Sequence, residues 1–395
     1  MAEKLGILTL NSISHVGLKR FPPELYVVGP GLEAPDAIVV RSHDMHEMKI
    51  GDGVKAIGRA GAGTNNIPVV LMSQRGVPVF NAPGANANAV KELVLAGMLM
   101  AARNLLPAIR FVDGLSGAGE ALDRHVESGK KKFSGVELPN HTLGVIGLGK
   151  IGSLVADAAI KLGMNVMGFD PEITVEAAWS LPAQVRKAHS IEELVRASDF
   201  ITVHVPLQEA TRNLINAQRI ALMKHGAILL NFAREGIVDN AAVIDALGSK
   251  KLRAYVCDFP AGEFSGHPEV IALPHLGAST REAEDNCAVM VVDQLRDYLE
   301  HGNIRNAVNF PDVVMKRESK YRLGIANANV PNMVGQISTA LAQHGLNIHN
   351  MINKSRGDMA YTMVDVDSPV SKKVLKAIES IEGVLALRYL PADAE

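Results

Sequence analysis

Three residues in the second half of the chain could together move a proton and orient a carboxylate. Arg234 follows the apolar run 227–231, His275 follows a second apolar run, and Glu263 lies between them. Histidine exchanges protons near neutral pH, and a carboxylate on its other ring nitrogen fixes the tautomer. Arginine binds a carboxylate through two parallel N–H bonds. Each residue alone could be a surface or loop charge, but their shared order favours oxidation of a hydroxyl beside a carboxylate.

A glycine-rich loop precedes this set. Residues 147–152 read Gly-Leu-Gly-Lys-Ile-Gly, after the apolar run 143–146 and before the helical pattern 153–162. Gly147 permits the tight turn, Gly149 lets the backbone approach a pyrophosphate, and Gly152 allows close helix–strand packing. The helix N-terminus then offers free N–H groups to the phosphates. A glycine loop without a ligand is the alternative when the motif is taken alone.

Asp170 makes the nucleotide interpretation specific. It ends the run 165–169 and lies 18 residues after Gly152. An acid near that spacing accepts the ribose hydroxyls of a dinucleotide. Its charge repels a 2′-phosphate, and Pro171-Glu172 supplies no arginine to bind one. The sequence therefore predicts NAD rather than NADP, with a solvated strand end as the alternative.

Strand and helix patterns that alternate along the chain must position these residues. Short apolar runs at 37–40, 54–57 and 77–80 indicate one set of βα units. A helix at 90–102 then opens a second set, with strands expected at 141–146, 165–169, 200–204, 227–231 and 254–258. Such alternation predicts α/β domains with doubly wound parallel sheets.

The region after Pro311 has a different order. A polar linker at 316–321 precedes strand 323–328, helix 333–344, strands 347–353 and 359–365, helix 372–381 and strand 384–390. This βαββαβ order is that of the ferredoxin-like unit. The predicted domains are residues 1–88 with 276–310, residues 89–275 for the nucleotide, and residues 318–395. The return of the chain, including helix 283–301, to the first domain rests on fold analogy.

Composition excludes several other classes. The 395 residues are 47% hydrophobic and 21% charged with a net charge of −2, which indicates globular domains without a nucleic-acid or membrane partner. Lys130–Lys132 is interpreted as a solvated face, and a contribution to the site of an anionic substrate is the less favoured alternative. Cys257 and Cys287 form no disulfide framework and are not spaced as a metal site. A reducing cytoplasm and no secretory signal are expected.

On these residues the chain resembles the D-2-hydroxyacid dehydrogenase family over nearly its whole length. Residues 144–152, 231–239 and 274–280 look like the family's three signature stretches, and 59–67 and 81–83 look like its substrate-domain segments. The resemblance implies that Arg234 orients the substrate, Glu263 is the partner acid and His275 is the acid/base. It implies a flavodoxin-like substrate domain, an active site between the domains, and cofactor contacts at Lys150, Ile151, Asp170, Val205, Phe232, Ala233 and Asp258.

Arg41-Ser42 narrows the substrate. The pair follows the strand 37–40, where an arginine beside a hydroxyl can bind a phosphate. In family members that act on 3-phosphoglycerate the matching pair binds the phosphate end, and Gly61, Ala62 and Gly63 would hold the carboxylate. The leading hypothesis is oxidation of 3-phospho-D-glycerate with NAD at the entry to serine synthesis. A solvent-facing Arg41, a glyoxylate or hydroxypyruvate reductase, and a non-catalytic NAD-sensing co-repressor are the alternatives.

The C-terminal region resembles an ACT domain, an amino-acid-binding regulatory module. Asn329 and Asn347 match asparagines that contact serine in such domains. Asn327 takes the place of a histidine in serine-sensitive members, and Asn332 replaces the usual glycine after Pro331. The resemblance therefore implies L-serine as an effector bound by Asn327, Asn329 and Asn347, with a purely dimerising domain as the alternative. It also implies a homodimer or homotetramer.

Overall fold

The computed structural model describes residues 4–391, and the chain divides into two compact units. The first contains residues 1–86 together with 281–395, and the second contains residues 87–280. The return of the chain after residue 280 makes the first unit discontinuous. The sequence separated residues 318–395 as a third domain, and that finer division stays a prediction.

The first unit contains a five-stranded parallel sheet in the order β2-β1-β3-β4-β5. This is the flavodoxin-like order that the sequence predicted. Val39 and Ile57 are fully buried because sheets of this kind are covered on both faces. The elements are β1 (Leu5–Leu10), α1 (His15–Leu18), β2 (Tyr26–Gly29), β3 (Ala37–Val40), β4 (Ala56–Arg59), α2 (Val69–Gln74), β5 (Val79–Phe80) and α11 (Arg281–His301).

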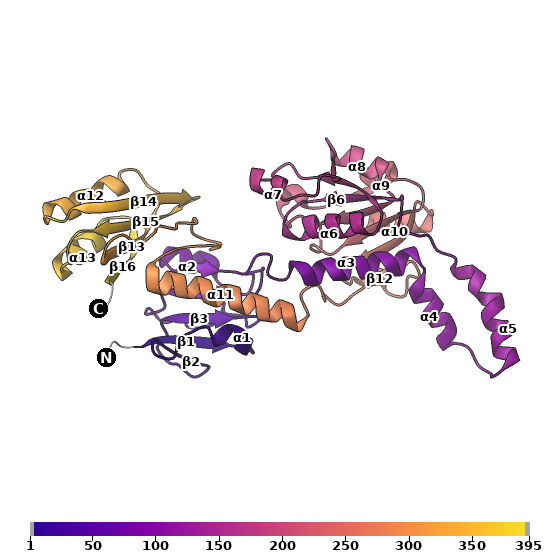
Figure 1. Ribbon diagram of the computed structural model, residues 1–395, viewed down its shortest axis with the longest axis horizontal. Helices are drawn as coiled ribbons and strands as arrows, with labels where there is room; N and C mark the ends of the chain where they lie inside the picture. The colour runs from indigo at the N-terminus through magenta and orange to yellow at the C-terminus, as the bar shows by residue number, and fades with distance from the viewer. Residues whose placement is uncertain (1–3, 392–395) are drawn as a thin grey trace. The chain divides into compact units, whose positions relative to one another are not determined.

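A second, antiparallel sheet in the same unit has the order β14-β15-β13-β16. Two helices cover one of its faces (Figure 1). The βαββαβ order predicted from the sequence is present, with boundaries within about three residues of those expected. The elements are β13 (Tyr321–Ala328), α12 (Met333–Gln343), β14 (Ile348–Arg356), β15 (Met359–Val366), α13 (Lys372–Glu379) and β16 (Val384–Pro391).

Side chains of the antiparallel sheet bind the C-terminal end of α11. Arg388 donates to the carbonyl oxygens of Tyr298 and Leu299, at 2.8 Å each, and its guanidinium lies 4.5 Å from the Tyr298 ring centroid. The buried Tyr361 hydroxyl donates to Gly302 O at 2.9 Å. The last carbonyls of a helix have no partner inside the helix, so Arg388 gives two of them a donor and adds favourable charge, while Tyr361 binds the carbonyl just after the helix. The antiparallel sheet is therefore anchored to α11.

A fully buried ion pair fixes the segment that joins α11 to β13. Arg322 Nε and Nη2 donate to the two carboxylate oxygens of Asp365 at 2.6 and 2.8 Å, and both side chains are 0% exposed. The other three N–H groups of Arg322 donate to the carbonyls of His301, Met315 and Lys316. All five donors are thus satisfied, which a buried guanidinium requires. The segment is held along its length rather than left as an open linker.

The second unit contains a seven-stranded parallel sheet in the order β12-β11-β10-β9-β6-β7-β8. Six of these strands follow the order of dinucleotide-binding sheets, whose direction of winding reverses between β6 and β9. The strands are β6 (Thr142–Ile146), β7 (Asn165–Phe169), β8 (Arg186–Lys187), β9 (Phe200–Val203), β10 (Ala227–Asn231), β11 (Leu252–Cys257) and β12 (Val270–Ala272). The helices that accompany them are α3 (Ala87–Ala102), α6 (Lys150–Lys161), α7 (Val175–Trp179), α8 (Ile191–Ala197), α9 (Ala217–Leu222) and α10 (Asn240–Gly248).

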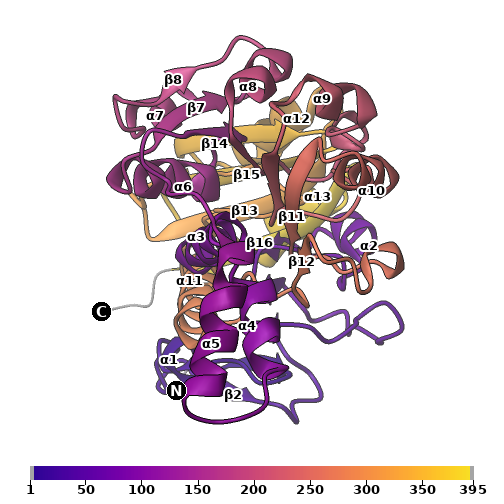
Figure 2. The same ribbon diagram turned by 90° about the vertical axis from the view of Figure 1, so that its right-hand side faces the viewer.

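Two further helices extend from this unit as a pair. Helices α4 (Leu105–Asp113) and α5 (Glu120–Gly129) lie side by side in both views (Figures 1 and 2). Phe111 on α4 contacts Phe133, with ring centroids 5.3 Å apart. The outer face of α4 exposes Leu105, Ile109 and Val112, which are 41, 54 and 57% exposed. No single described helix meets the length and hydropathy needed to cross a membrane; α3 and α4 meet it only together, with a 67° bend between them.

Candidate functional site

The glycine loop has the geometry that a pyrophosphate requires. Gly147 has φ 90°, in the left-handed region. A Cβ on Gly152 would lie 1.9 Å from Gly147 O, so only glycine lets α6 begin this close to the turn. A Cβ on Gly149 would meet nothing within 4 Å, so open space faces the N-terminus of α6 at Lys150. The residues present therefore fit a dinucleotide bound at a helix N-terminus.

Asp170 at the end of β7 is held against this loop. One carboxylate oxygen accepts from Leu148 N at 2.8 Å, and the other accepts from Glu172 N at 3.0 Å. Each oxygen has a second lone pair, so both can still accept from a hydroxyl. These bonds position the carboxylate beside the glycine loop, where the sequence expected the ribose hydroxyls.

The other predicted cofactor contacts follow the strands that flank the loop. Val205 lies after β9, and its Cγ1 would be 3.0 Å from a Cβ on Gly147. Phe232 and Ala233 follow β10 and are 4 and 9% exposed. Lys150 and Ile151 begin α6. These positions lie at the carboxyl edge of the sheet, and the individual contacts with a nucleotide stay predictions.

Arg234, Glu263 and His275 follow three neighbouring strands of the same sheet. Arg234 comes after β10, Glu263 after β11, and His275 after β12, and β11 pairs in parallel with both β10 and β12. The carboxyl ends of parallel strands share one edge, so the segments that carry these three exposed side chains leave the sheet at the edge that carries the glycine loop. Asn231 shapes the turn, because its amide donates to Arg234 O and its Oδ1 accepts from Ala233 N.

His275 is held by its backbone in an unusual conformation. It has φ 56°, in the left-handed region that histidine seldom adopts. Its N–H donates to Asp258 O, and the Asp258 carboxylate accepts from Leu276 N and Gly277 N at 2.7 Å each. The imidazole packs against Phe259, with ring centroids 5.0 Å apart. Asp258, which is 1% exposed, therefore anchors the turn that presents His275, and its predicted cofactor contact stays a prediction.

Glu263 has a different partner from the expected one. It lies in the short helix η3 (Gly262–Phe264), and its Oε1 accepts from Asn240 Nδ2 at 3.3 Å. Among the described residues its carboxylate contacts Asn240 rather than His275. Pairing with the imidazole would require this exposed side chain to leave Asn240. The sequence did not single out Asn240, although it follows Asp239 at the start of α10.

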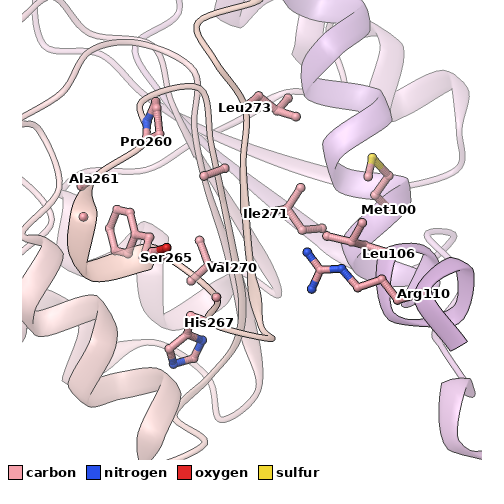
Figure 3. Close-up of a pocket in the computed structure, with 14 residues that line it drawn as sticks. Met100, Leu106, Arg110, Pro260, Ala261, Ser265, His267, Val270, Ile271 and Leu273 are labelled. Carbon is pink, nitrogen blue, oxygen red and sulfur yellow. The ribbon is translucent and has the colours of Figure 1, made fainter. Parts of the chain in front are cut away.

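A cavity of about 640 Å³ is lined in part by the loop between β11 and β12 (Figure 3). Gly262 and Phe264, the two neighbours of Glu263, line it. Its apolar lining comes from α3, α4 and β12, and Figure 3 shows Arg110 and His267 among the polar lining groups. The other labelled residues in the view are Met100, Leu106, Pro260, Ala261, Ser265, Val270, Ile271 and Leu273.

His204, which the sequence did not single out, is half-buried beside the glycine loop. A Cβ on Gly147 would lie 2.8 Å from its carbonyl, and its Nε2 is 3.0 Å from Thr202 Oγ1. Desolvation of the imidazole, whose Nδ1 is buried, lowers the pKa of His204 from 6.5 to about 3. Its Nδ1 has no hydrogen-bond partner in the structure. The imidazole is therefore neutral near pH 7.

This burial predicts acid sensitivity of the nucleotide-binding unit. The folded pKa lies below the unfolded value, so the full stability is present above about pH 6.5 and is lost as the pH falls toward 3. We expect a loss of about 1 kcal/mol per pH unit between pH 6 and 4.5. The measurement is the unfolding midpoint against pH for the wild type and His204→Gln. An equally steep decline in both proteins would contradict the prediction.

The predicted substrate residues lie in the first unit at the ends of β3 and β4. Arg41 follows β3, and Asn66 Nδ2 donates to Arg41 O at 3.3 Å. Ser42 N donates to Asn11 Oδ1 at 3.1 Å. Gly61 follows β4, and Asn81 Nδ2 donates to Ala62 O at 2.6 Å. The loop that includes Gly63 thus presents its backbone from a fixed position, while its role in carboxylate binding stays a prediction.

The three predicted effector asparagines do not share one environment. Asn327 is 1% exposed, and its Nδ2 donates to Ala328 O at 2.8 Å, so an effector contact would require a changed side-chain position. Asn329 is exposed and lies beside Asp358, at the start of β15. Asn347 is exposed and lies beside Asp367, at the end of β15. The eight residues of β15 separate the two exposed asparagines by roughly 25 Å.

One departure from the ACT pattern has a structural explanation. Asn332, which stands where a glycine is usual, has φ 67° and ψ 12° at the start of α12. Asparagine tolerates this left-handed conformation better than other residues with a side chain. The turn before α12 therefore keeps the backbone that a glycine would give.

Comparisons with known proteins agree with this geometry. The model of the D-isomer specific 2-hydroxyacid dehydrogenase NAD-binding domain matches residues 95–277. A D-3-phosphoglycerate dehydrogenase of Escherichia coli is 32% identical over 85% of this chain and 81% of its own length. The enzyme of that name from Methanocaldococcus jannaschii is 38% identical over 73% of this chain and 54% of its own. An NAD⁺-bound 3-phosphoglycerate dehydrogenase structure from Entamoeba histolytica superimposes with a TM-score of 0.60 at 26% identity, covering 78% of this chain and 99% of that one.

The chain belongs to the D-isomer specific 2-hydroxyacid dehydrogenase family. The second unit accordingly contains that family's NAD-binding domain, as the glycine loop and Asp170 predicted. The chain spans about half the length of the Methanocaldococcus relative.

Proposed function

We propose that the protein oxidises 3-phospho-D-glycerate to 3-phosphooxypyruvate with NAD, at the entry to the phosphorylated route of serine synthesis. The observation that carries the dehydrogenase assignment is the placement of Arg234, Glu263 and His275 after three neighbouring strands of the NAD-binding sheet. The similarity to phosphoglycerate dehydrogenases of archaea and bacteria supports the substrate. Arg41 after β3 supplies a group suited to the phosphate.

The proposed roles follow from the chemistry of each side chain. His275 accepts the proton of the C2 hydroxyl as the alcohol becomes a ketone. Arg234 binds the substrate carboxylate and orients C2. Glu263, after leaving Asn240, would stabilise the imidazolium through the second ring nitrogen. NAD supplies the acceptor for the hydride that leaves C2, so the products are the oxo acid, NADH and one proton.

The carboxylate of Asp170 predicts a strong preference for NADH over NADPH. A 2′-phosphate would place negative charge beside this carboxylate, which is already fixed by Leu148 N. We expect kcat/KM with NADPH to be about a hundredfold lower than with NADH, which corresponds to about 2.7 kcal/mol. Steady-state reduction of the oxo acid with both cofactors measures it. Equal efficiency with the two cofactors would overturn the cofactor assignment.

A glyoxylate or hydroxypyruvate reductase is the alternative within the family. Such an enzyme would not need Arg41, so turnover of phosphoglycerate against D-glycerate separates the two. A non-catalytic NAD-sensing co-repressor is the alternative from another class. It would bind NADH without turnover of either acid. The exposure of Arg234 and His275, which leaves both able to reach a substrate, favours the enzyme over this alternative.

The antiparallel sheet is proposed as an ACT domain that binds L-serine in a homodimer or homotetramer. Asn329 and Asn347 lie at opposite ends of β15, so one amino acid could contact both only if two copies contributed. The exposed apolar face of α4 supports self-association as well. A monomer in sedimentation velocity would contradict the assembly. An unchanged rate up to millimolar L-serine would leave the sheet a structural role.

The cytoplasm is the proposed location. Cys257 and Cys287 are both free and buried, as expected of a protein made in a reducing compartment. Fractionation of the host cell would test this, and recovery outside the cytoplasm would contradict it.

A further inference from the structure

Arg41, the side chain assigned to the substrate phosphate, is already bound to an acid. Its Nη2 donates to Glu284 Oε1 at 2.6 Å. The two side chains are 35 and 40% exposed, so the pair is open to solvent on one side. Glu284 is the only partner that the described residues offer the Arg41 guanidinium. The pair joins residues 243 positions apart, at the end of β3 and in the first turn of α11.

The surroundings hold both partners in place. Ser42 N donates to Asn11 Oδ1, and Asn66 Nδ2 donates to Arg41 O. These two hydrogen bonds fix the backbone of Arg41 and Ser42. Glu284 lies at the N-terminal end of α11, where the helix dipole stabilises a carboxylate. The backbone on both sides of the pair is therefore fixed, by hydrogen bonds at Arg41 and Ser42 and by the helix at Glu284.

A second arginine belongs to the same group of charges. Arg59 ends β4 directly beside Val40, the residue before Arg41. Burial raises the pKa of the nearby Cys287 thiol, while Arg59 and Arg41 lower it and Glu284 raises it again. All three charged side chains thus lie within electrostatic reach of one buried thiol. Two cations at the carboxyl ends of β3 and β4 therefore lie near one carboxylate on α11.

We propose that Glu284 is a specificity-determining residue that competes with the substrate phosphate for Arg41. The inference rests on the proposed role of Arg41 as the phosphate-binding residue. A phosphate that reaches the arginine must displace the carboxylate or lie beside it, and two anions so close repel each other. Glu284 therefore weakens binding of a phosphorylated substrate and leaves an uncharged distal group unaffected. It also keeps the guanidinium in position when no substrate is bound.

Glu284→Gln removes the charge and keeps an oxygen that can accept from Arg41. We expect the KM for 3-phosphoglycerate to fall about tenfold at low ionic strength, a size limited by solvent exposure of the pair. The kcat should change less than about twofold, and the KM for D-glycerate should not change. Glu282→Gln is the matched control, because Glu282 lies in the same helical turn and is exposed. Its KM should equal that of the wild type.

The outcomes separate this inference from the proposed function. An unchanged or higher KM in Glu284→Gln, or an equal fall in Glu282→Gln, would overturn the role of Glu284 while phosphoglycerate turnover stands. If the wild type does not turn over phosphoglycerate, calorimetric titration with inorganic phosphate tests whether Glu284 competes with phosphate for Arg41. Tighter phosphate binding in Glu284→Gln that Arg41→Ala abolishes would support the competition and reject the substrate. No change in phosphate binding would reject both.

Discussion

His275→Asn is expected to lower kcat by about 10²- to 10⁴-fold, the range typical for loss of a general acid/base. Asparagine is the substitution of choice because His275 has φ 56°, a conformation that asparagine adopts readily. The turn held by Asp258 should therefore keep its shape, and the loss would report on proton transfer rather than on the backbone. Steady-state rates in both reaction directions measure the effect.

A matched control lies in the same unit. His225 is exposed and lies in the loop before β10, so His225→Asn should retain wild-type kcat. Calorimetric titration with NADH should give wild-type affinity for both variants. Retention of more than about a tenth of kcat in His275→Asn would remove the histidine from the proposed mechanism.

Removal of either partner of the buried Arg322–Asp365 pair is expected to destabilise the antiparallel sheet by about 3–5 kcal/mol. In Asp365→Ala the guanidinium would stay buried without its two charged bonds. In Arg322→Met the carboxylate would stay buried, and the carbonyls of His301, Met315 and Lys316 would lose their donor. Hydrogen exchange of the amides in β13 and β15 measures the free energy of local opening.

The double variant Arg322→Met/Asp365→Val gives the control. It leaves no unpaired buried charge, so its cost should be well below the sum of the two single costs. Single variants that cost less than about 1 kcal/mol would show that water reaches the pair and that the anchoring is weak. Additive costs would show that the two side chains act independently.

The periodic elements of the fold were predictable from the sequence because their apolar residues recur at fixed spacing. The predicted strand 165–169 agrees with β7 at both ends. The predicted helix 90–102 agrees with α3 at its C-terminal end, Ala102. The edge strands β8 and β12 were not predicted, since two or three residues carry no period. Helices α4 and α5 were also missed, and their projection from the unit has no local signature. The anchoring of the antiparallel sheet by Arg322 joins segments that no local pattern relates.

The candidate site was predictable where the chemistry follows a strand end. Arg41, Arg234 and His275 each come within three residues of the end of an apolar run, so their placement at a sheet edge could be inferred. The partners of these residues could not be inferred, because they come from distant segments. Asn240 binds Glu263, Asp258 holds the His275 turn, and Glu284 binds Arg41 across 243 residues. Only the fold brings these groups together.

Turnover of 3-phosphoglycerate against D-glycerate, in the wild type and in Arg41→Ala, tests the central claim most directly. Loss of one charged contact to phosphate corresponds to about 1.5–3 kcal/mol, or roughly 10- to 150-fold in kcat/KM. We expect Arg41→Ala to lose that factor with phosphoglycerate and to keep wild-type kcat/KM with D-glycerate. Equal turnover of phosphoglycerate by the two proteins would contradict the assignment of this chain as a phosphoglycerate dehydrogenase.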